Sequence, residues 1–142
     1  MSPPPDEVKA WLRKAHSDLL SARILIGHSS LVLGSAAFHC QQAVEKTLKA
    51  FLVWQSVPFE KVHSLVYLVD LCEAKEPGFA ALREETESLS PYATEIRYPS
   101  ESPEISLEDA RQALAAAEAV WRFVLGLLPR DLQVSIPQRD SV

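Results

Sequence analysis

The sequence predicts an all-α protein that folds as an up-and-down bundle of four to five helices. Apolar residues recur at steps of three and four along several long segments, which places them on one side of a helix. No segment alternates apolar and polar residues as a half-buried strand would, and the sequence has only four glycines for tight turns. With 142 residues, of which 47% are hydrophobic, the chain is long enough to bury a single core.

Two long helices are predicted in the first half of the chain. The first spans about residues 6–26, between a proline-rich start and Gly27. The second spans about residues 31–55 and ends before Pro58. Their apolar stripes comprise Val8, Trp11, Leu12, Ala15, Leu19, Ala22 and Ile26 in the first helix, and Ala36, Ala37, Cys40, Ala43, Val44, Thr47, Leu48, Phe51 and Trp54 in the second.

Two shorter helices are predicted next. One covers about residues 64–74, with Ser64 as its N-cap, and the other covers about residues 79–89, after a turn at Pro77. Residues 90–106 contain three prolines and show no helical period, so this segment is expected to be a loop.

The last helix is predicted over residues 106–128, where Ser106 and Asp109 have the spacing of a capping box. Its apolar stripe alternates steps of three and four residues, which is typical of a helix packed lengthwise against another helix, either inside the bundle or in a homodimer. A single helical domain is therefore expected over residues 6–128, followed by a polar, flexible tail over residues 129–142.

Composition restricts the partners and the compartment. A net charge of -5 and a pI of about 5.3 argue against broad attraction to nucleic acid, although a local basic groove remains compatible with them. Cys40 and Cys72 fall on predicted helices and are interpreted as buried thiols, which fits a reducing cytoplasm. No secretory signal or membrane-spanning segment is seen, so a cytoplasmic protein without a membrane partner is expected.

The familiar catalytic and cofactor motifs are not found in the sequence. It has no glycine-rich phosphate loop, no Cys-x-x-Cys, no His-Glu-x-x-His and no Gly-x-Ser-x-Gly. The four histidines are not spaced as ligand pairs on one helix face. No metal, no cofactor and no self-sufficient enzymatic activity are therefore expected.

The polar face of the second helix is the first candidate site. His39 and Gln42 offer hydrogen bonds there, while Lys46 and Lys49 offer positive charge to a phosphate or to an acidic partner. The alternative is that this lysine-rich face is merely solvated.

A second candidate site lies in the proline-rich segment, where Tyr92 and Tyr98 flank Arg97. Aromatic rings can stack on a base and a guanidinium can hold a phosphate. The alternative is that these side chains pin the loop to the bundle. His63 is a further binding candidate, although hydrogen bonding to a neighbouring loop is the simpler interpretation of a lone histidine.

Three blocks resemble a known family, the HEPN domain, in the prokaryotic branch found beside small nucleotidyltransferases. They are AFHCQQAVEK at residues 37–46, KVHSL at residues 61–65 and IRYP at residues 96–99, and the resemblance extends over about residues 6–128. It implies a four- to five-helix bundle, commonly a homodimer, that associates with a nucleotide or RNA. It also implies a separately encoded nucleotidyltransferase as partner, in a toxin-antitoxin-like pair.

This chain lacks one feature of the ribonuclease members of that family. Those members use an arginine followed, after four to six intervening residues, by a histidine. If Arg97 matches that arginine, the corresponding positions 102–104 hold Ser, Pro and Glu, and no histidine follows His63. Metal-independent ribonuclease activity is therefore the disfavoured alternative, since it would require His39 or His63 to replace the missing acid-base group. A protein-interaction subunit without a ligand is the other alternative to a nucleotide- or RNA-binding module.

Overall fold

The computed structural model describes residues 4–94 and 105–133, and within these ranges the protein is all-α, without a strand. This confirms the predicted fold class. The α-helices are α1 (Pro5–His28), α2 (Leu33–Trp54), α3 (Leu65–Lys75), α4 (Arg83–Glu87), α5 (Leu107–Leu127) and α6 (Arg130–Gln133), and the 3-10 turns are η1 (Ser30–Val32), η2 (Pro77–Leu82) and η3 (Ser90–Tyr92).

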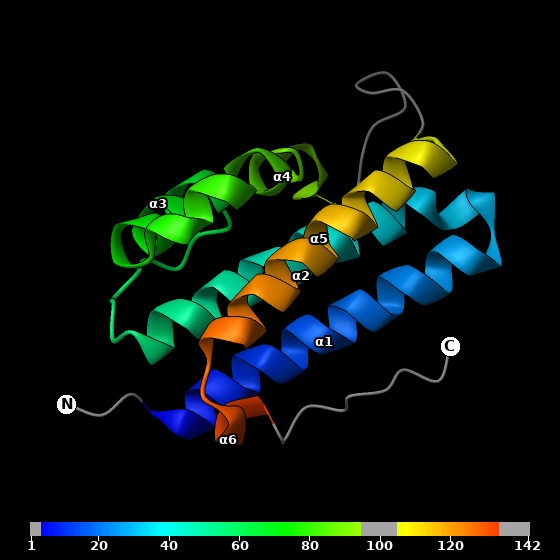
Figure 1. The fold of residues 1–142 in the computed structure, drawn as a ribbon. Coiled ribbons are helices and arrows are strands. Elements are labelled where there is room, and N and C mark those ends of the chain that lie inside the picture. The colour runs from blue at the N-terminus through cyan, green and yellow to red at the C-terminus, as the bar shows by residue number, and fades with distance from the viewer. Residues whose placement is uncertain (1–3, 95–104, 134–142) are drawn as a thin grey trace.

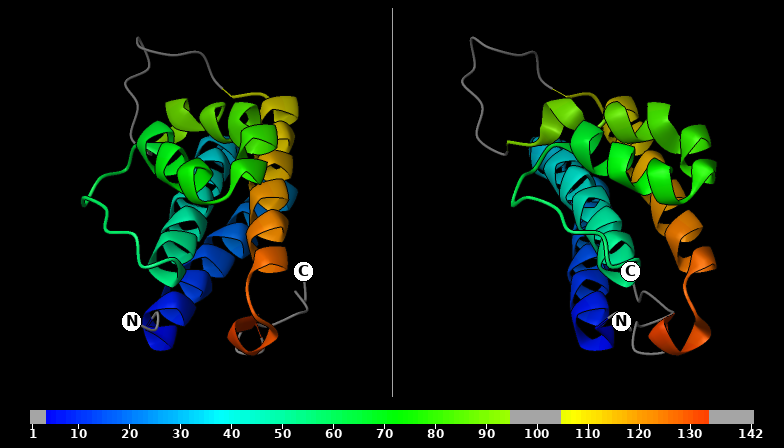
Figure 2. Two further views of the ribbon diagram at one scale, coloured as in Figure 1. Left: turned by 60° about the vertical axis from the view of Figure 1, so that its left-hand side comes forward. Right: turned by 90° about the vertical axis from the view of Figure 1, so that its left-hand side faces the viewer.

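The helices form an up-and-down bundle with α2 at its centre. Helices α1 and α2 are antiparallel, the α3–α4 segment reverses direction again, and α5 runs back beside α2 (Figure 1). Helix α2 contacts α1, α3 and α5 from different sides, and α6 returns to the beginning of α1 (Figure 2). Since 15 of the 22 residues of α2 are buried, polar side chains on this helix are forced to find partners inside the protein.

The predicted apolar stripes form the core. Val8, Leu12, Ala15, Leu19 and Ala22 of α1 are fully buried. Aromatic rings from three elements continue the core, because Phe79 of η2 lies with its ring centroid 4.9 Å from those of Phe51 in α2 and Phe123 in α5. These edge-to-face contacts fasten the α3–α4 segment to the α2–α5 pair.

The predicted helix starts are confirmed at two positions. The Ser64 side chain accepts a hydrogen bond from the Tyr67 N–H at the start of α3. At the start of α5, Ser106 and Asp109 form a reciprocal capping box.

The prediction of one continuous helix over residues 79–89 is wrong, because η2 occupies its beginning, α4 ends at Glu87 and a turn follows at residues 88–89. Helical structure begins earlier, at Pro77, where the Glu76 carboxylate accepts a hydrogen bond from the Gly78 N–H. A Cβ on Gly78 would lie 3.0 Å from the Phe123 ring, so close packing against α5 shapes this turn. Tight packing thus overrides the helical period of a short segment.

The chain also continues in an ordered form beyond the predicted end of the bundle. In α6 the Leu132 side chain is buried against the core, and the Gln133 amide donates hydrogen bonds to the carbonyl oxygens of Leu125 and Leu128. Residues 130–133 were expected to be flexible but are packed against the bundle, because Leu132 is buried and the Gln133 amide is hydrogen-bonded to the end of α5. The remainder of that expected tail, residues 134–142, lies outside the described residues.

The apolar stripe of α5 is used inside the bundle. From Ala110 to Leu128 its predicted members are buried or half-buried within this chain, and only Leu107 at its beginning is exposed. The stripe therefore gives no independent support to a homodimer, which remains a prediction from the family resemblance. Within the described ranges no helix is sufficiently long and apolar to cross a membrane.

Candidate functional site

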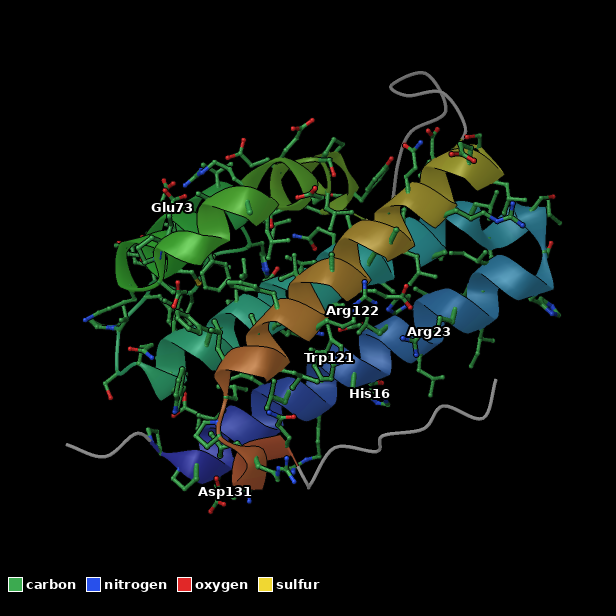
Figure 3. The ribbon with its side chains drawn as sticks, viewed as in Figure 1. His16, Arg23, Glu73, Trp121, Arg122 and Asp131 are labelled. Atoms are coloured by element: carbon green, nitrogen blue, oxygen red, sulfur yellow. The ribbon has the colours of Figure 1, made fainter. Side chains whose placement is uncertain are left out.

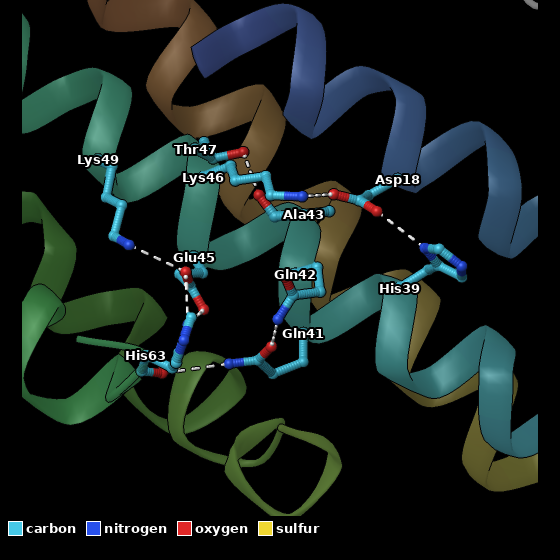
Figure 4. A network of polar contacts seen from close by, with 10 residues as sticks. All are labelled: Asp18, His39, Gln41, Gln42, Ala43, Glu45, Lys46, Thr47, Lys49 and His63. Atoms are coloured by element: carbon cyan, nitrogen blue, oxygen red, sulfur yellow. Dashed lines mark hydrogen bonds and ion pairs between the residues drawn. The ribbon is translucent and has the colours of Figure 1, made fainter. Parts of the chain in front are cut away.

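Two carboxylates organise the polar residues that border α2. Asp18 is contributed by α1 and Glu45 by α2 itself, and each lies between a lysine and a histidine (Figure 4). A buried carboxylate is stable only with charged or hydrogen-bonding partners, so these contacts determine the arrangement of the whole face.

Asp18 joins α1 to α2. Its Oδ1 accepts a hydrogen bond from His39 Nδ1 at 2.8 Å, and its Oδ2 accepts one from Lys46 Nζ at 2.6 Å. The Asp18 side chain is only 10% exposed, whereas those of His39 and Lys46 are 28% and 22% exposed. Lys46 is thereby neutralised by a carboxylate of this chain.

Glu45 is buried more deeply, with a side chain that is 3% exposed. Lys49 Nζ lies 2.9 Å from Glu45 Oε2, and His63 Nδ1 lies 3.0 Å from the same oxygen. The Lys49 side chain is itself 7% exposed, and its ammonium lies 5.3 Å and 5.9 Å from the ring centroids of Trp11 and Phe59. This lysine is a core residue held by an ion pair and by cation–π contacts.

Two glutamines hold the segment before α3 against α2. Gln41 is fully buried, and its Nε2 donates to the backbone oxygen of His63 at 3.3 Å. Gln42 Nε2 donates in turn to Gln41 Oε1 at 2.7 Å. The position of His63 is therefore fixed through its backbone as well as through its ring.

The two imidazoles are oriented by their carboxylates. An ionised carboxylate only accepts hydrogen bonds, so Nδ1 carries the proton in both rings and Nε2 points away from the carboxylate. The His63 side chain is 74% exposed and is the most accessible member of either group. Such rings can donate or accept a proton at a defined position, or bind an anion when protonated.

The structure places four of the predicted site residues in the two carboxylate-centred groups, namely His39, Lys46, Lys49 and His63. Gln42 is linked through Gln41 to the backbone of His63. The side chain of His63 pairs with Glu45 rather than with a neighbouring loop.

The loop candidates are placed differently. Tyr92 is half-buried in η3 and packs against the hydrophobic core, so it anchors the beginning of the loop. Arg97 and Tyr98 lie outside the described residues.

Neither carboxylate was predicted as a site residue from the sequence. Asp18 lies next to Leu19 and within one turn of Ala15 and Ala22, which are all buried. An acidic residue beside an apolar stripe was therefore the available sign that this carboxylate has partners inside the bundle. Glu45 and Lys49 have the i, i+4 spacing of a helical ion pair, which could have shown that this lysine is not free.

A second polar group lies where α1 faces α5. The His16 and Trp121 ring centroids are 5.9 Å apart, and Arg23 forms an ion pair with Glu118 at 2.9 Å (Figure 3). Burial, assisted by the nearby Arg23 charge, lowers the pKa of His16, so this imidazole is neutral at pH 7. Ring packing and ion pairing explain these residues without a ligand.

The cysteines are buried and free, as predicted. Burial, with smaller contributions from Glu118 and Asp18, raises the pKa of Cys40 to about 12, and burial raises that of Cys72. Neither thiol has the thiolate character of a nucleophile at pH 7. In the part of the chain that the structure describes, no group of three or more His, Cys, Asp or Glu side chains could hold a metal ion.

Comparison with known proteins gives one match. The family model of the HEPN domain matches residues 8–127, which is most of the chain and includes both carboxylate-centred groups. No curated protein and no solved structure is similar enough to be matched.

Proposed function

Because the chain belongs to the HEPN domain family, we propose that it binds a nucleotide or RNA through the outer residues of the α2 polar groups, together with Arg97 and Tyr98. We call the outer residues His39, Gln42 and His63 the imidazole face. It supplies hydrogen bonds to a phosphate, while the loop residues supply a guanidinium and a ring for stacking.

The observation that carries this proposal is the orientation of His63 and His39 by buried carboxylates. Each ring is held at Nδ1 by a carboxylate that is at most 10% exposed, and Nε2 is directed elsewhere. A side chain that is already fixed loses less conformational entropy when a ligand binds. Preorganised imidazoles of this kind favour a specific site over a merely solvated surface.

The loop residues extend the proposed site. The turn η3 packs against α2, and the described chain reaches Thr94 two residues later. Arg97 follows Thr94 by three residues, which spans at most about 11 Å. Because Tyr92 is used for packing, we assign base stacking to Tyr98 and phosphate binding to Arg97.

The proposal includes a partner protein. Family membership supports a cytoplasmic pair with a separately encoded nucleotidyltransferase, of the toxin-antitoxin-like kind, and a homodimer of this chain. Co-purification of this chain with the products of its neighbouring genes, followed by size-exclusion chromatography with light scattering, tests both. Elution of this chain alone, at the mass of a monomer, contradicts both.

Ligand binding is tested by isothermal titration with ATP, GTP and a short RNA. We expect Arg97→Glu to abolish the binding seen in the original protein. Arg130→Glu is the matched control, because it reverses an exposed arginine on α6, which follows the C-terminal end of α5. Unchanged affinity in a folded Arg97→Glu protein refutes the loop assignment, and no heat from any ligand favours an interaction subunit without a ligand.

A second candidate function is metal-independent RNA cleavage. The carboxylate-oriented imidazoles favour it, because the Nε2 of His39 or of His63 could take the proton of a 2′-hydroxyl and then return it to the leaving 5′-oxygen. RNA cleavage in EDTA by the original protein, lost in His39→Ala or His63→Ala, would support it. Intact RNA after incubation with the folded original protein would remove it.

A further inference from the structure

The fixed charges beneath the imidazole face cancel. Asp18 is paired with Lys46, and Glu45 is paired with Lys49, so each carboxylate already has one permanent cation. The lysines that the sequence offered as phosphate-binding charge are thus compensated by their own neighbours. This part of the molecule has no surplus positive charge from its lysines.

The imidazoles are the variable members of this charge balance. His39 contacts Asp18, and His63 contacts Glu45. Each histidine is the most exposed ionisable side chain of its group. Histidine is the side chain whose charge ordinarily changes between about pH 5 and 8. Each protonation therefore adds one uncompensated positive charge on the outer side of a neutral pair.

We propose that His39 and His63 each bind a phosphate of the ligand together with a proton, so that affinity is controlled by protonation of these two imidazoles. This rests on the proposed nucleotide or RNA binding and specifies how that site would be regulated. A protonated Nε2 donates a charge-assisted hydrogen bond to a phosphate oxygen, whereas a neutral ring with its proton on Nδ1 presents only an acceptor there. An anionic ligand therefore binds the protonated rings selectively.

The other charged groups near His63 are either paired with one another or opposite in sign. His63 faces Glu45 of α2, with Lys49 behind it, and its own segment carries the exposed Glu60 and Lys61. The latter two have opposite charges, so they add no net charge beside the ring.

His39 has a similar balance around it. It faces Asp18 of α1, which also holds Lys46, and the apolar ring of Phe38 lies beside it. On α5, Glu118 is paired with Arg23 of α1. Protonation of the two imidazoles is therefore the main source of new charge on this face.

The test compares the original protein with a His39→Gln and His63→Gln double variant at about pH 5.5 and about pH 8. The probes are ATP and a hexauridylate methylated at every 2′-oxygen, which blocks cleavage through the 2′-hydroxyl. Dividing the dissociation constant of the variant by that of the original protein cancels ionisation of the ligand itself. We expect this ratio to be near one at the higher pH and at least about tenfold larger at the lower pH for the bound probe.

The matched control is His28→Gln, at an exposed histidine at the end of α1. Its ratio should stay near one at both pH values, and circular dichroism checks that every variant is folded. A ratio for the double variant that is the same at both pH values overturns proton-coupled binding and leaves the proposed function standing. Failure of both probes to bind the original protein at any pH removes the proposed function as well.

A second measurement needs no variant. Titration of the original protein with the bound probe near pH 7, in two buffers with different ionisation enthalpies, gives the number of protons taken up. We expect net uptake, of up to two protons per chain, and binding without uptake overturns the inference even if the double variant does not fold.

Discussion

Replacing Glu45 by leucine removes the carboxylate that compensates a buried ammonium. The Glu45 and Lys49 side chains are 3% and 7% exposed, and the Lys49 ammonium is enclosed by the rings of Trp11 and Phe59. Removing one partner of a buried pair typically costs about 3–5 kcal/mol, because the other charge is left unpaired. For a chain of this size that loss lowers the melting temperature by roughly 10 °C.

Urea denaturation followed by circular dichroism measures the effect, and a second substitution separates its cause. Glu45→Leu combined with Lys49→Met removes both charges, so most of the lost free energy of unfolding should return. Glu118→Gln, which breaks a pair whose side chains are about one quarter exposed, is the control and should cost about 1 kcal/mol or less. A Glu45→Leu protein that loses no more than this control would refute the reasoning, as would a double variant no more stable than Glu45→Leu.

Three further predictions concern stability and reactivity. Ser106→Ala removes the cap that bonds the Asp109 N–H, and we expect a loss of about 1 kcal/mol in the urea-derived free energy of unfolding; no loss would mean that α5 does not depend on its capping box. Because burial raises the pKa of Cys40 to about 12, a thiol reagent should label it at pH 8 only after denaturation, and rapid labelling of the folded chain would contradict its burial. Thr86 is buried, and its hydroxyl has no hydrogen-bond partner among the described residues, so Thr86→Val should keep or slightly raise the melting temperature, whereas a fall of several degrees would reveal a bond that the hydroxyl makes.

Periodicity predicted the long helices because each buries a regular stripe. For α1 the predicted members Val8, Leu12 and Leu19 are fully buried, and for α5 the capping residues fix the start. The same reasoning failed over residues 79–89, since a short segment has too few turns for a period to outweigh local packing. There the Phe79 ring and the space beside Gly78 decide the backbone.

The candidate site shows a different limit of sequence reasoning. Spacing alone places His39, Gln42, Lys46 and Lys49 on one side of α2, although the structure shows Lys49 to be buried. The spacing of residues in the sequence could not predict which side chain pairs with each charged residue. Asp18 lies on another helix, and only the packing of α1 on α2 brings its carboxylate to Lys46.

This distinction bears on what the family resemblance means for function. The block at residues 37–46 includes buried Gln41 and Glu45, which tie the segment before α3 and Lys49 to the central helix. These residues specify the bundle, and a match over them is a statement about the fold. The proposed function instead depends on groups that the bundle leaves accessible, for which we propose the Nε2 atoms of His39 and His63.

An overall charge of -5 is compatible with such a site. Binding that relied on permanent cations would oppose the repulsion of the whole chain at pH 7, and Lys46 and Lys49 are already compensated. A site whose charge appears only on protonation attracts phosphate locally and conditionally. Acidic composition therefore excludes broad electrostatic binding of nucleic acid, but it does not exclude a ligand held by two oriented imidazoles.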